Sequence, residues 1–403
     1  MCSESCSVQM KNNMQDDKKR KILIFSTAYY PFVGGAEVAI KEITDRLGSR
    51  FEFDLVTAKL DRKLSDFEKI GNVNVHRVGG FGGTLDKLLL PFRGFLLANK
   101  LSKQQEYLCM WGMMVTYGSG AGFILNIYRK FLFKRKIPMV LTLQEGDSEA
   151  HLRFKWFGLI ALSWKLALFQ TDILTAISNF LLKRAQKNGF KKESFLVPNG
   201  VDLTIFGSEV SLETKNEIKK ILNKKEDDIF LVTTGRLTHK NATDDIISAL
   251  TKLPKNVSLI VIGKGEGGPK LQKQASDLGL GERVKFLGFI PYGEIPKFFS
   301  VCDIFIRPSR SEGFGNSFIE AMAAKVPVVA TPVGGIPDFL TDNETGLFCS
   351  PDNPQSITKA VNKILGDESL RTLIVENAYN RVVERYDWGH VAKQMGEVFD
   401  KVA

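Results

Sequence analysis

The stretch Pro308-Ser-Arg-Ser-Glu312-Gly-Phe-Gly-Asn-Ser-Phe-Ile-Glu320-Ala-Met-Ala-Ala-Lys325 carries two carboxylates eight positions apart. A strand-like run, Asp303–Arg307, comes directly before it, and another, Val326–Ala330, comes directly after it. Short apolar runs bounded by turn residues are typical of buried parallel strands. The stretch therefore predicts a strand, a glycine-rich loop, a helix and a second strand, with the start of the helix directed into a cleft.

The start of that helix is a candidate phosphate site. A helix N-terminus offers free backbone N–H groups and the positive end of the helix dipole, and glycines let the backbone approach a ligand closely. The residues expected to contact the ligand there are Gly313, Phe314, Gly315, Asn316 and Ser317. Glu312 and Glu320 flank the site and can accept hydrogen bonds from sugar hydroxyls. A phosphate between two polyols describes a nucleotide sugar; the alternative is a plain loop tip and a solvated helix residue.

The pattern Glu-Gly-Phe-Gly-x4-Glu-Ala-Met-Ala resembles the Glu-x7-Glu signature of the retaining glycosyltransferases of family 4, which have the GT-B fold. The loop Thr331–Asp338 is similar to the next loop of that family. The resemblance implies that Glu312 faces the donor sugar and that Glu320 holds the ribose of the nucleotide. It covers nearly the whole chain from Lys21 onward.

The rest of the chain alternates strand-like and helix-like segments, which predicts an α/β fold with doubly wound parallel sheets. A polar, lysine-rich stretch interrupts this alternation before Asp228. We expect a disordered lead-in at 1–20, an acceptor-binding Rossmann-like domain at 21–205 and a nucleotide-sugar-binding Rossmann-like domain at 206–380. The resemblance implies that these domains face each other across a central cleft and that a helix at 381–403 returns to the first domain.

Gly235-Arg-Leu-Thr-His-Lys240 follows a predicted strand and resembles the diphosphate-binding motif of the family. A guanidinium and an ammonium four residues apart can clamp a diphosphate and stabilise the negative charge of the leaving group. The sequence has no Asp-x-Asp motif, so we expect Arg236 and Lys240 to act without a metal, and we expect no cofactor. The alternative is a pair of surface charges at a helix start.

Two segments of the first domain are candidates for the other side of the cleft. Gly34 and Gly35 follow the first strand and resemble a loop of the family that faces the donor phosphate; a plain turn is the alternative. Gln144 stands where many members of the family have a histidine, so we expect it to hydrogen-bond a sugar hydroxyl. Asp147, or Glu145 beside it, is a candidate for orienting the acceptor.

Gly263-Lys-Gly265-Glu-Gly-Gly268 matches the Gly-x-Gly-x-x-Gly pattern of dinucleotide-binding loops. It supports an alternative function, an NAD-dependent oxidoreductase. Pro269 follows at once, and the pattern lies in the second half of the chain, both of which count against that alternative. The resemblance instead implies that Gly263 belongs to the nucleotide-binding loop.

The chain has 403 residues, 44% of them hydrophobic, and a net charge of +10, which indicates a soluble protein with an anionic partner. Five scattered cysteines form no metal-ligand pattern and indicate a cytoplasmic protein. The uncharged segment Tyr107–Tyr128 is long enough to span a bilayer, but its glycines favour a buried strand, a loop and a core helix.

Thr84–Lys100 and His151–Lys165 combine apolar and basic residues, so either could contact an anionic membrane; core helices with snorkelling lysines are the alternative. We expect no nucleic-acid partner, because Lys130–Lys136 is the only concentrated basic run with interleaved aromatics.

These observations predict a retaining, metal-independent hexosyltransferase that uses a nucleotide-diphosphate sugar and a glycan or lipid-linked acceptor. We expect a cytoplasmic protein that could also contact the inner face of the cell membrane, with a role in polysaccharide or glycolipid synthesis. A non-catalytic protein of the same fold is the alternative. The donor base, the sugar and the acceptor stay open.

Overall fold

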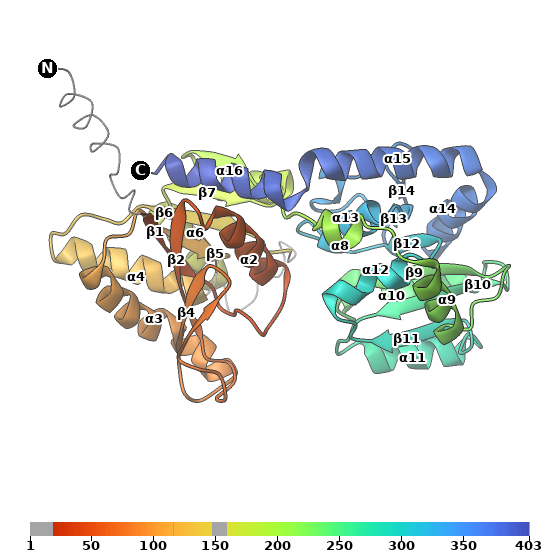
Figure 1. Ribbon diagram of the computed structural model, residues 1–403, viewed down its shortest axis with the longest axis horizontal. Helices are drawn as coiled ribbons and strands as arrows, with labels where there is room; N and C mark the ends of the chain where they lie inside the picture. Colours follow the sequence, from red (N-terminus) through yellow and green to blue (C-terminus); the bar gives the residue numbers. More distant parts are fainter. Residues whose placement is uncertain (1–18, 116, 147–158, 403) are drawn as a thin grey trace, which may run out of the picture.

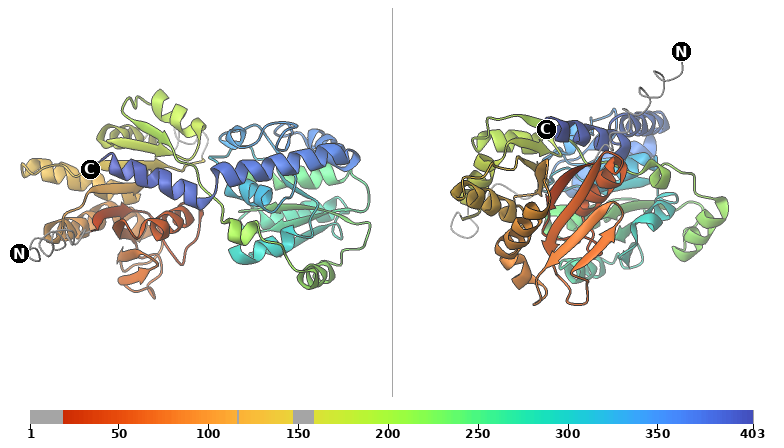
Figure 2. Two further views of the ribbon diagram at one scale, coloured as in Figure 1. Left: turned by 45° about the horizontal axis from the view of Figure 1, so that its top comes forward. Right: turned by 60° about the vertical axis from the view of Figure 1, so that its left-hand side comes forward.

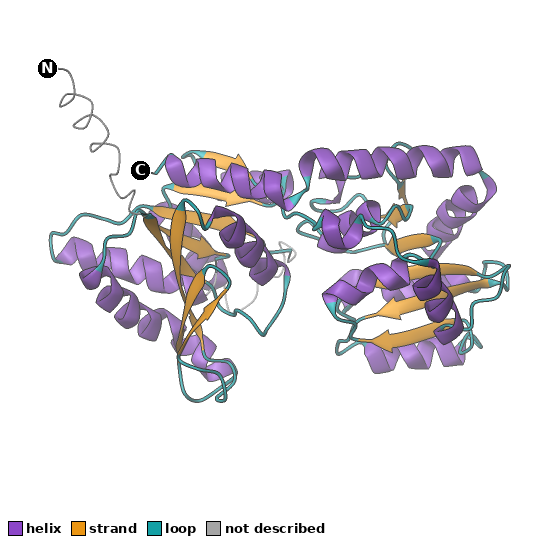
Figure 3. Ribbon diagram, viewed as in Figure 1, coloured by secondary structure: helices purple, strands orange, loops and turns teal. Residues whose placement is uncertain are grey.

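The computed structural model describes residues 19–115, 117–146 and 159–402, with the side chains of 159–163 left out. These residues form two α/β halves that lie side by side (Figure 1). Helices flank the strands of both sheets (Figure 3). Two parallel-sheet domains are the architecture that the alternating pattern predicts.

The first sheet has the strand order β3-β4-β2-β1-β5-β6-β7-β8 in the described part of the chain, and only the β3–β4 pair is antiparallel. Its strands are β1 (Arg20–Phe25), β2 (Phe51–Ala58), β3 (Phe67–Ile70), β4 (Val73–Val78), β5 (Cys109–Met113), β6 (Met139–Leu143), β7 (Ile173–Ala176) and β8 (Ser194–Leu196). The helices of this half are α2 (Gly35–Leu47), α3 (Thr84–Gln104), α4 (Tyr117–Phe131), α6 (Leu159–Gln170) and α7 (Asn179–Lys187).

The second sheet has the order β11-β10-β9-β12-β13-β14, with every described pair parallel. Its strands are β9 (Ile229–Thr234), β10 (Val257–Ile262), β11 (Val284–Gly288), β12 (Ile304–Arg307), β13 (Val328–Ala330) and β14 (Leu347–Phe348). The remaining α-helices are α8 (Leu203–Phe206), α9 (Leu212–Ile221), α10 (Thr243–Leu250), α11 (Gly268–Asp277), α12 (Ile295–Phe299), α13 (Asn316–Ala323), α14 (Pro354–Gly366), α15 (Glu368–Arg385) and α16 (Trp388–Asp400). Short 3-10 helices lie at η2 (His239–Asn241), η3 (Tyr292–Glu294) and η4 (Ile336–Asp338).

Both faces of the first sheet are covered, which explains why β1 is an unbroken apolar run. Ile22 and Ile24 belong to a core with residues of α2 and α16. Leu23 and Phe25 point to the opposite face and belong to a core with residues of α3 and α4. Because side chains alternate between the two faces along a strand, a strand that is buried on both faces has apolar residues at successive positions.

The end of the chain crosses from the second half to the first. Helix α15 lies along the second domain, and α16 lies over the first (Figure 2). Helix α16 packs against α2, and its Trp388 and Phe399 are fully buried there. The boundary expected at 380/381 falls inside α15, and the helix that reaches the first domain begins at Trp388.

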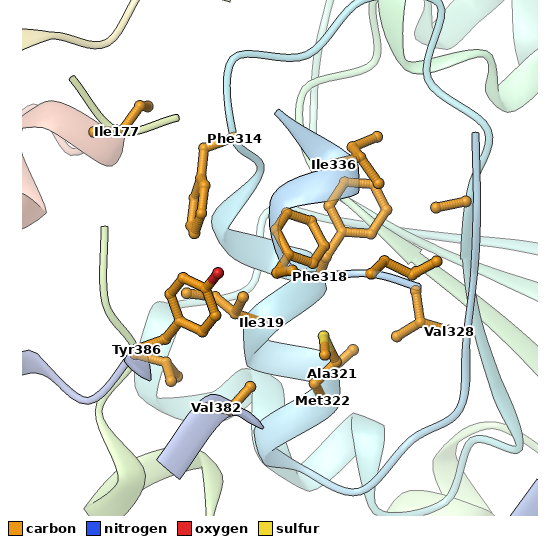
Figure 4. Close-up of a cluster of buried hydrophobic side chains, with 14 of the residues drawn as sticks. Ile177, Phe314, Phe318, Ile319, Ala321, Met322, Val328, Ile336, Val382 and Tyr386 are labelled. Carbon is orange, nitrogen blue, oxygen red and sulfur yellow. The ribbon is translucent and has the colours of Figure 1, made fainter. Parts of the chain in front are cut away.

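A third core extends from the first domain into the second. Ile177, at the end of β7, shares it with Phe314, Ile336 and Tyr386 (Figure 4). Phe314 is buried with its ring 5.3 Å from that of Phe339 and 5.6 Å from that of Tyr386. The two domains therefore meet through packed side chains directly beside the Glu312–Gly315 loop.

None of the helices in the described ranges is long and apolar enough to cross a membrane. The uncharged segment 107–128 contains β5 and most of α4, as the strand, loop and helix interpretation of this segment predicts.

Candidate active site

The predicted loop and helix lie between β12 and α13. Gly315 is the N-cap of α13 and has φ 96°, a conformation that favours glycine. A Cβ atom there would lie 2.5 Å from the ring of Phe318 and 2.9 Å from Arg307. Gly315 has no side chain that could cap the helix, so backbone N–H groups of the first turn are available to a ligand. The side chain of Phe314 points into the core, which leaves only its backbone for a donor.

Glu312 lies at the tip of the loop and is held from two sides. One carboxylate oxygen forms an ion pair with Arg307, the last residue of β12. The other accepts a hydrogen bond from the backbone N–H of Gly313 at 3.0 Å. The side chain is 12% exposed, so the carboxylate has one defined orientation with an edge open to a ligand. Arg307 was not among the residues that the sequence analysis identified.

Glu320 lies about one helical turn beyond Asn316, the first residue of α13, and is 7% exposed. Burial raises the pKa of Glu320 to about 7, and the positive charge of Arg307 opposes that rise. Within the described ranges, no donor lies within hydrogen-bonding distance of its carboxyl group. A buried carboxylate without a partner is costly in the free protein, so a ligand that supplies hydroxyl groups would satisfy it.

Arg236 and Lys240 lie in the loop after β9. The backbone of this loop is fixed, because Asn241 donates to the Arg236 carbonyl at 2.6 Å and the N–H of Arg310 donates to the Lys240 carbonyl at 2.7 Å. In the part of the chain that the structure describes, neither cationic side chain has a carboxylate within ion-pairing distance. The loop begins beside Arg307, since a Cβ atom at Gly235 would lie 3.4 Å from that guanidinium.

The glycines of the Gly-x-Gly-x-x-Gly segment allow the loop after β9, which carries Arg236, to pack closely against this segment. A Cβ atom at Gly263 would lie 1.9 Å from the Gly235 carbonyl oxygen, and one at Gly265 would lie 2.4 Å from that of Leu237. The N–H of Gly267 donates to the Leu237 carbonyl at 2.9 Å. The space that these glycines open is filled by the loop that carries Arg236, not left for a dinucleotide. This geometry counts against the oxidoreductase alternative.

The first domain brings its own glycines to the start of α13. Gly34 is the N-cap of α2, and a Cβ atom at Gly35 would lie 3.5 Å from the amide nitrogen of Asn316. Burial raises the pKa of Glu37, in the first turn of α2, and the charge of Arg236 is one of the influences that lower it. The Gly34–Gly35 loop therefore lies opposite the predicted donor site, on the side that the sequence analysis expects.

A chain of three amides connects the two domains. The amide nitrogen of Gln144, after β6, donates to Asn199 at 3.1 Å, and that of Asn199 donates to Asn316 at 3.0 Å. Asn199 is buried and lies in the connection between the domains. The sequence analysis did not identify it, although the segment Phe195–Asp202, which contains it, breaks the alternating pattern with a turn. Gln144 is thereby oriented toward the start of α13.

The loop after β6 touches the loop between β12 and α13, residues 308–315, which is called the acidic loop here because it carries Glu312. The hydroxyl of Ser311 donates to the Gly146 carbonyl at 2.9 Å, and a Cβ atom at Gly146 would lie 2.7 Å from the backbone nitrogen of Gly313. Glu145 turns away from this contact. Its oxygens accept hydrogen bonds from the N–H groups of Val115 and Gln144, and burial raises the pKa of its carboxyl group.

Asp147, the predicted acceptor-orienting residue, lies outside the described residues, as does most of the segment His151–Lys165. The other described candidates lie at or next to the start of α13: Gly34, Gly35, Gln144, Gly313, Gly315, Asn316, Ser317 and the two glutamates. Arg236 and Lys240 lie in the loop that begins at Gly235, beside Arg307.

Comparison with known proteins identifies this arrangement. Residues 33–205 match the model of the family described as Glycosyltransferase Family 4, and residues 214–381 match that of Glycosyl transferases group 1. The chain belongs to glycosyltransferase family 4. The resemblance drawn from the Glu312–Glu320 signature is thus confirmed, and so is the prediction that the chain is a glycosyltransferase.

Relatives extend over nearly the whole family 4 chain. An uncharacterized glycosyltransferase of Methanocaldococcus jannaschii is 27% identical over 94% of this chain and 97% of its own length. The GDP-mannose-dependent alpha-(1-6)-phosphatidylinositol monomannoside mannosyltransferase of Mycolicibacterium smegmatis is 29% identical over 56% of this chain and 62% of its own. The crystal structure of Anabaena HepE in complex with UDP and glucose superposes with a TM-score of 0.75 at 23% identity, covering 95% of this chain and all of that one. The fold is GT-B.

Proposed function

We propose that this family 4 enzyme transfers a hexose, with retention of configuration and without a metal ion, from a nucleotide-diphosphate sugar to a glycan or lipid-linked acceptor. The observation that carries the proposal is the placement of Arg236 and Lys240, which have no carboxylate within ion-pairing distance among the described residues, in a loop that begins beside the Arg307–Glu312 pair. A diphosphate at the uncapped start of α13 would meet both those cations and free N–H groups.

Each part of the donor has a candidate partner. Glu320, buried and without a hydrogen-bond donor in the described ranges, suits the ribose hydroxyls. Glu312, fixed by Arg307, suits the hexose. As the sugar–phosphate bond breaks, negative charge grows on the departing diphosphate. Lys240 and Arg236 stabilise that charge without the help of a metal ion.

The acceptor side belongs to the first domain. Gln144 cannot act as a base, but its position in the amide chain with Asn199 lets it orient a hydroxyl. The leaving phosphate lies on the face that the acceptor attacks and takes the acceptor proton. The bond therefore forms on the face from which the leaving group departs. The product keeps the α configuration of the donor.

The named relatives support the substrate class. The mycobacterial relative is named as a mannosyltransferase that acts on a phosphatidylinositol mannoside, and the Anabaena structure contains UDP and glucose. Both names combine a nucleotide with a hexose, and the first adds a lipid-linked acceptor. Synthesis of a cell-surface polysaccharide or glycolipid is the role that fits these names, with uridine and guanosine as the bases to test first.

The surface of the first domain supports a contact with anionic membrane. Four apolar side chains of α3 are about half or more exposed on one helix face: Leu85, Leu88, Phe92 and Leu96. At the end of α4, exposed Phe131, Leu132 and Phe133 are followed by the basic residues Lys134–Lys136. Apolar side chains beside cations suit the interface of an anionic bilayer. We therefore place the enzyme at the inner face of the cell membrane.

Sedimentation with vesicles tests this contact. Phosphatidylglycerol vesicles should bind the wild-type protein more strongly than phosphatidylcholine vesicles, and Phe92→Ser with Leu96→Ser should weaken that binding. Equal recovery of wild type and double variant with both vesicles would contradict the proposed contact.

The transferase proposal is tested in two steps. A thermal-shift screen with UDP, GDP and ADP sugars should identify a donor, because a ligand that binds the folded state raises its apparent stability. Transfer of that donor should then proceed in excess chelator, and proton NMR of the first product should show an α linkage. A β linkage from an α donor would refute retention. Activity that chelator abolishes and magnesium restores would refute metal independence. Binding without turnover would favour the non-catalytic alternative.

A further inference from the structure

Arg307 is an unusual residue for the position that it occupies. It ends β12, a strand whose preceding residues Ile304–Ile306 are fully buried, and it is itself only 6% exposed. Burying a guanidinium is costly, and buried ion pairs are often replaceable by apolar residues without loss of stability. Its Nε atom adds to that cost, because it is buried with no hydrogen-bond partner within the described residues. Stability of the core alone does not account for an arginine here.

The contacts of Arg307 reach three parts of the candidate site. One terminal nitrogen forms the ion pair with Glu312. The other donates to the hydroxyl of Ser317, in the first turn of α13, at 2.6 Å, and to the carbonyl of Thr234, the last residue of β9, at 3.3 Å. The guanidinium also lies 4.4 Å from the centre of the Phe318 ring, which fixes its plane.

These contacts suit a fork-shaped group. A guanidinium can donate to several acceptors in one plane, whereas an ammonium acts as a single point charge. The glycines around it leave it room, because a Cβ atom at Gly315 would lie 2.9 Å from one terminal nitrogen and one at Gly235 would lie 3.4 Å from the other. The acidic loop, the start of α13 and the start of the Gly235–Lys240 loop therefore close around one side chain.

We propose that Arg307 is a positioning residue that fixes the carboxylate of Glu312 against the donor sugar and keeps the Glu312 loop in register with the loop that carries Arg236 and Lys240. It acts through Glu312 and needs no contact with the donor. This inference rests on the proposed function for its kinetic consequences. Its structural consequence, the ordering of the Ser311–Gly315 loop, does not depend on the identity of the donor.

Hydrogen–deuterium exchange tests the structural part in the protein without any donor. In Arg307→Met, backbone amides of Ser311–Gly315 should exchange faster than in the wild type, while those of α15 should not change. Arg283→Met is the matched control. Arg283 lies in the same domain, and its partners within the described ranges are the backbone carbonyls of Val257, Leu253 and Pro254. The control should leave the Ser311–Gly315 loop unchanged. Unaltered exchange of that loop in Arg307→Met would overturn the inference, whatever the donor proves to be.

Kinetics test the functional part with the donor that the thermal-shift screen identifies. Arg307→Met should lower kcat by about 100-fold, the scale of a reacting group misplaced by about an ångström. The dissociation constant of the bare nucleotide diphosphate should stay within about threefold, since the ribose and diphosphate partners remain. Arg307→Lys should have a higher kcat than Arg307→Met but a lower kcat than the wild type. It keeps the positive charge but loses the planar set of donors of the guanidinium.

A double-variant cycle separates positioning from general destabilisation. Glu312→Gln should itself lower kcat, and adding Arg307→Met should lower it by less than about threefold more, because both changes remove the same interaction. Losses that simply multiply would overturn the inference, as would an Arg307→Met protein with wild-type kcat. Absence of turnover in the wild type would count against the proposed function alone, and the exchange experiment would still decide the role of Arg307.

Discussion

The two sides of the domain interface satisfy their charged groups in different ways. In the second domain, cations meet carboxylates: Arg307 pairs with Glu312, and Arg310 pairs with Asp244 and Asp245. On the first-domain side of the interface, backbone N–H groups hold the buried carboxylate of Glu145. Among the described residues, Arg236 and Lys240 of the second domain have no such ion pair, whereas the first domain presents amides and glycines to the site.

This difference indicates that paired and unpaired cations have different roles. A paired cation such as Arg310, which also donates to the His239 carbonyl at 2.8 Å, shapes the loop around it. Arg236 and Lys240 lie in the loop after β9 that Arg310 contacts. They have no ion pair among the described residues, so they are available to an anionic ligand. Amides and glycines suit neutral hydroxyl groups. The comparison is consistent with our proposal that the nucleotide diphosphate binds to the second domain and the acceptor hydroxyl to the first.

The largest expected effect concerns the unpaired cations. Lys240→Ala should lower kcat by about 10²–10³-fold, because the charge that it stabilises appears in the transition state. Lys273→Ala is the control: Lys273 is in the same domain but is paired with Asp277 on exposed α11. Steady-state kinetics of both variants decide the point. Equal activity of the two would remove the distinction between paired and unpaired cations.

The next effect concerns the buried carboxylate of the second domain. Glu320→Ala should weaken donor binding by about 1.5–3 kcal/mol, the worth of hydrogen bonds to a charged group. Glu294→Ala is the control, since Glu294 is exposed and pairs only with Lys297 among the described residues. Calorimetric titration with the nucleotide measures both. A folded Glu320→Ala protein with wild-type affinity would show that the ribose binds elsewhere.

The same carboxylate predicts a dependence of stability on pH. Burial raises the pKa of Glu320 from 4.5 to about 7, against the opposing charge of Arg307. Between these values the folded state binds a proton that the unfolded state lacks, so its contribution to stability is lost as pH rises from about 4.5 to 7. Relative to wild type, Glu320→Gln should therefore gain on the order of 2 kcal/mol between pH 5 and pH 8. Urea unfolding at both pH values measures this. A constant difference would mean that Glu320 is ionised throughout.

The smallest effect belongs to the first domain. Gln144→Ala should slow transfer by roughly tenfold, the scale of one neutral hydrogen bond, because Gln144 orients groups and moves no proton. Its loss should not alter the pH profile of kcat. A loss of several thousandfold with the fold intact is the size expected when a general base is removed. It would show that the first domain carries out proton transfer.

Much of the site was predictable because its signals are local. The spacing of Glu312 and Glu320, the glycines before α13 and the cations after β9 each lie within one strand–loop–helix segment. Elements of this kind form from short-range patterns of apolar and turn residues. The family resemblance rests on the same short segments, and the comparisons with known proteins confirm it.

The parts that the sequence analysis missed depend on contacts between distant segments. Asn199 joins Gln144, 55 positions before it, to Asn316, 117 positions after it. In the sequence Arg307 is simply the last residue of a strand-like run, whereas in the structure its partners lie on β9, on the loop that carries Glu312 and on α13. Gly263 fitted a dinucleotide-binding pattern, but the backbone of Gly235 occupies the space beside it.

By itself, the sequence determined the alternating strands and helices, the two domains' class of fold, and the residue types of the nucleotide-sugar site that we propose. These follow from periodicity and from chemistry at fixed spacing, which are properties of neighbouring residues. Only the tertiary structure decided which charges are paired, which carboxylates are buried, and that Phe314 belongs to the core. Pairing and burial depend on where the sheets, the interdomain connection and the crossing helix α16 place segments hundreds of residues apart, and no local pattern encodes that placement.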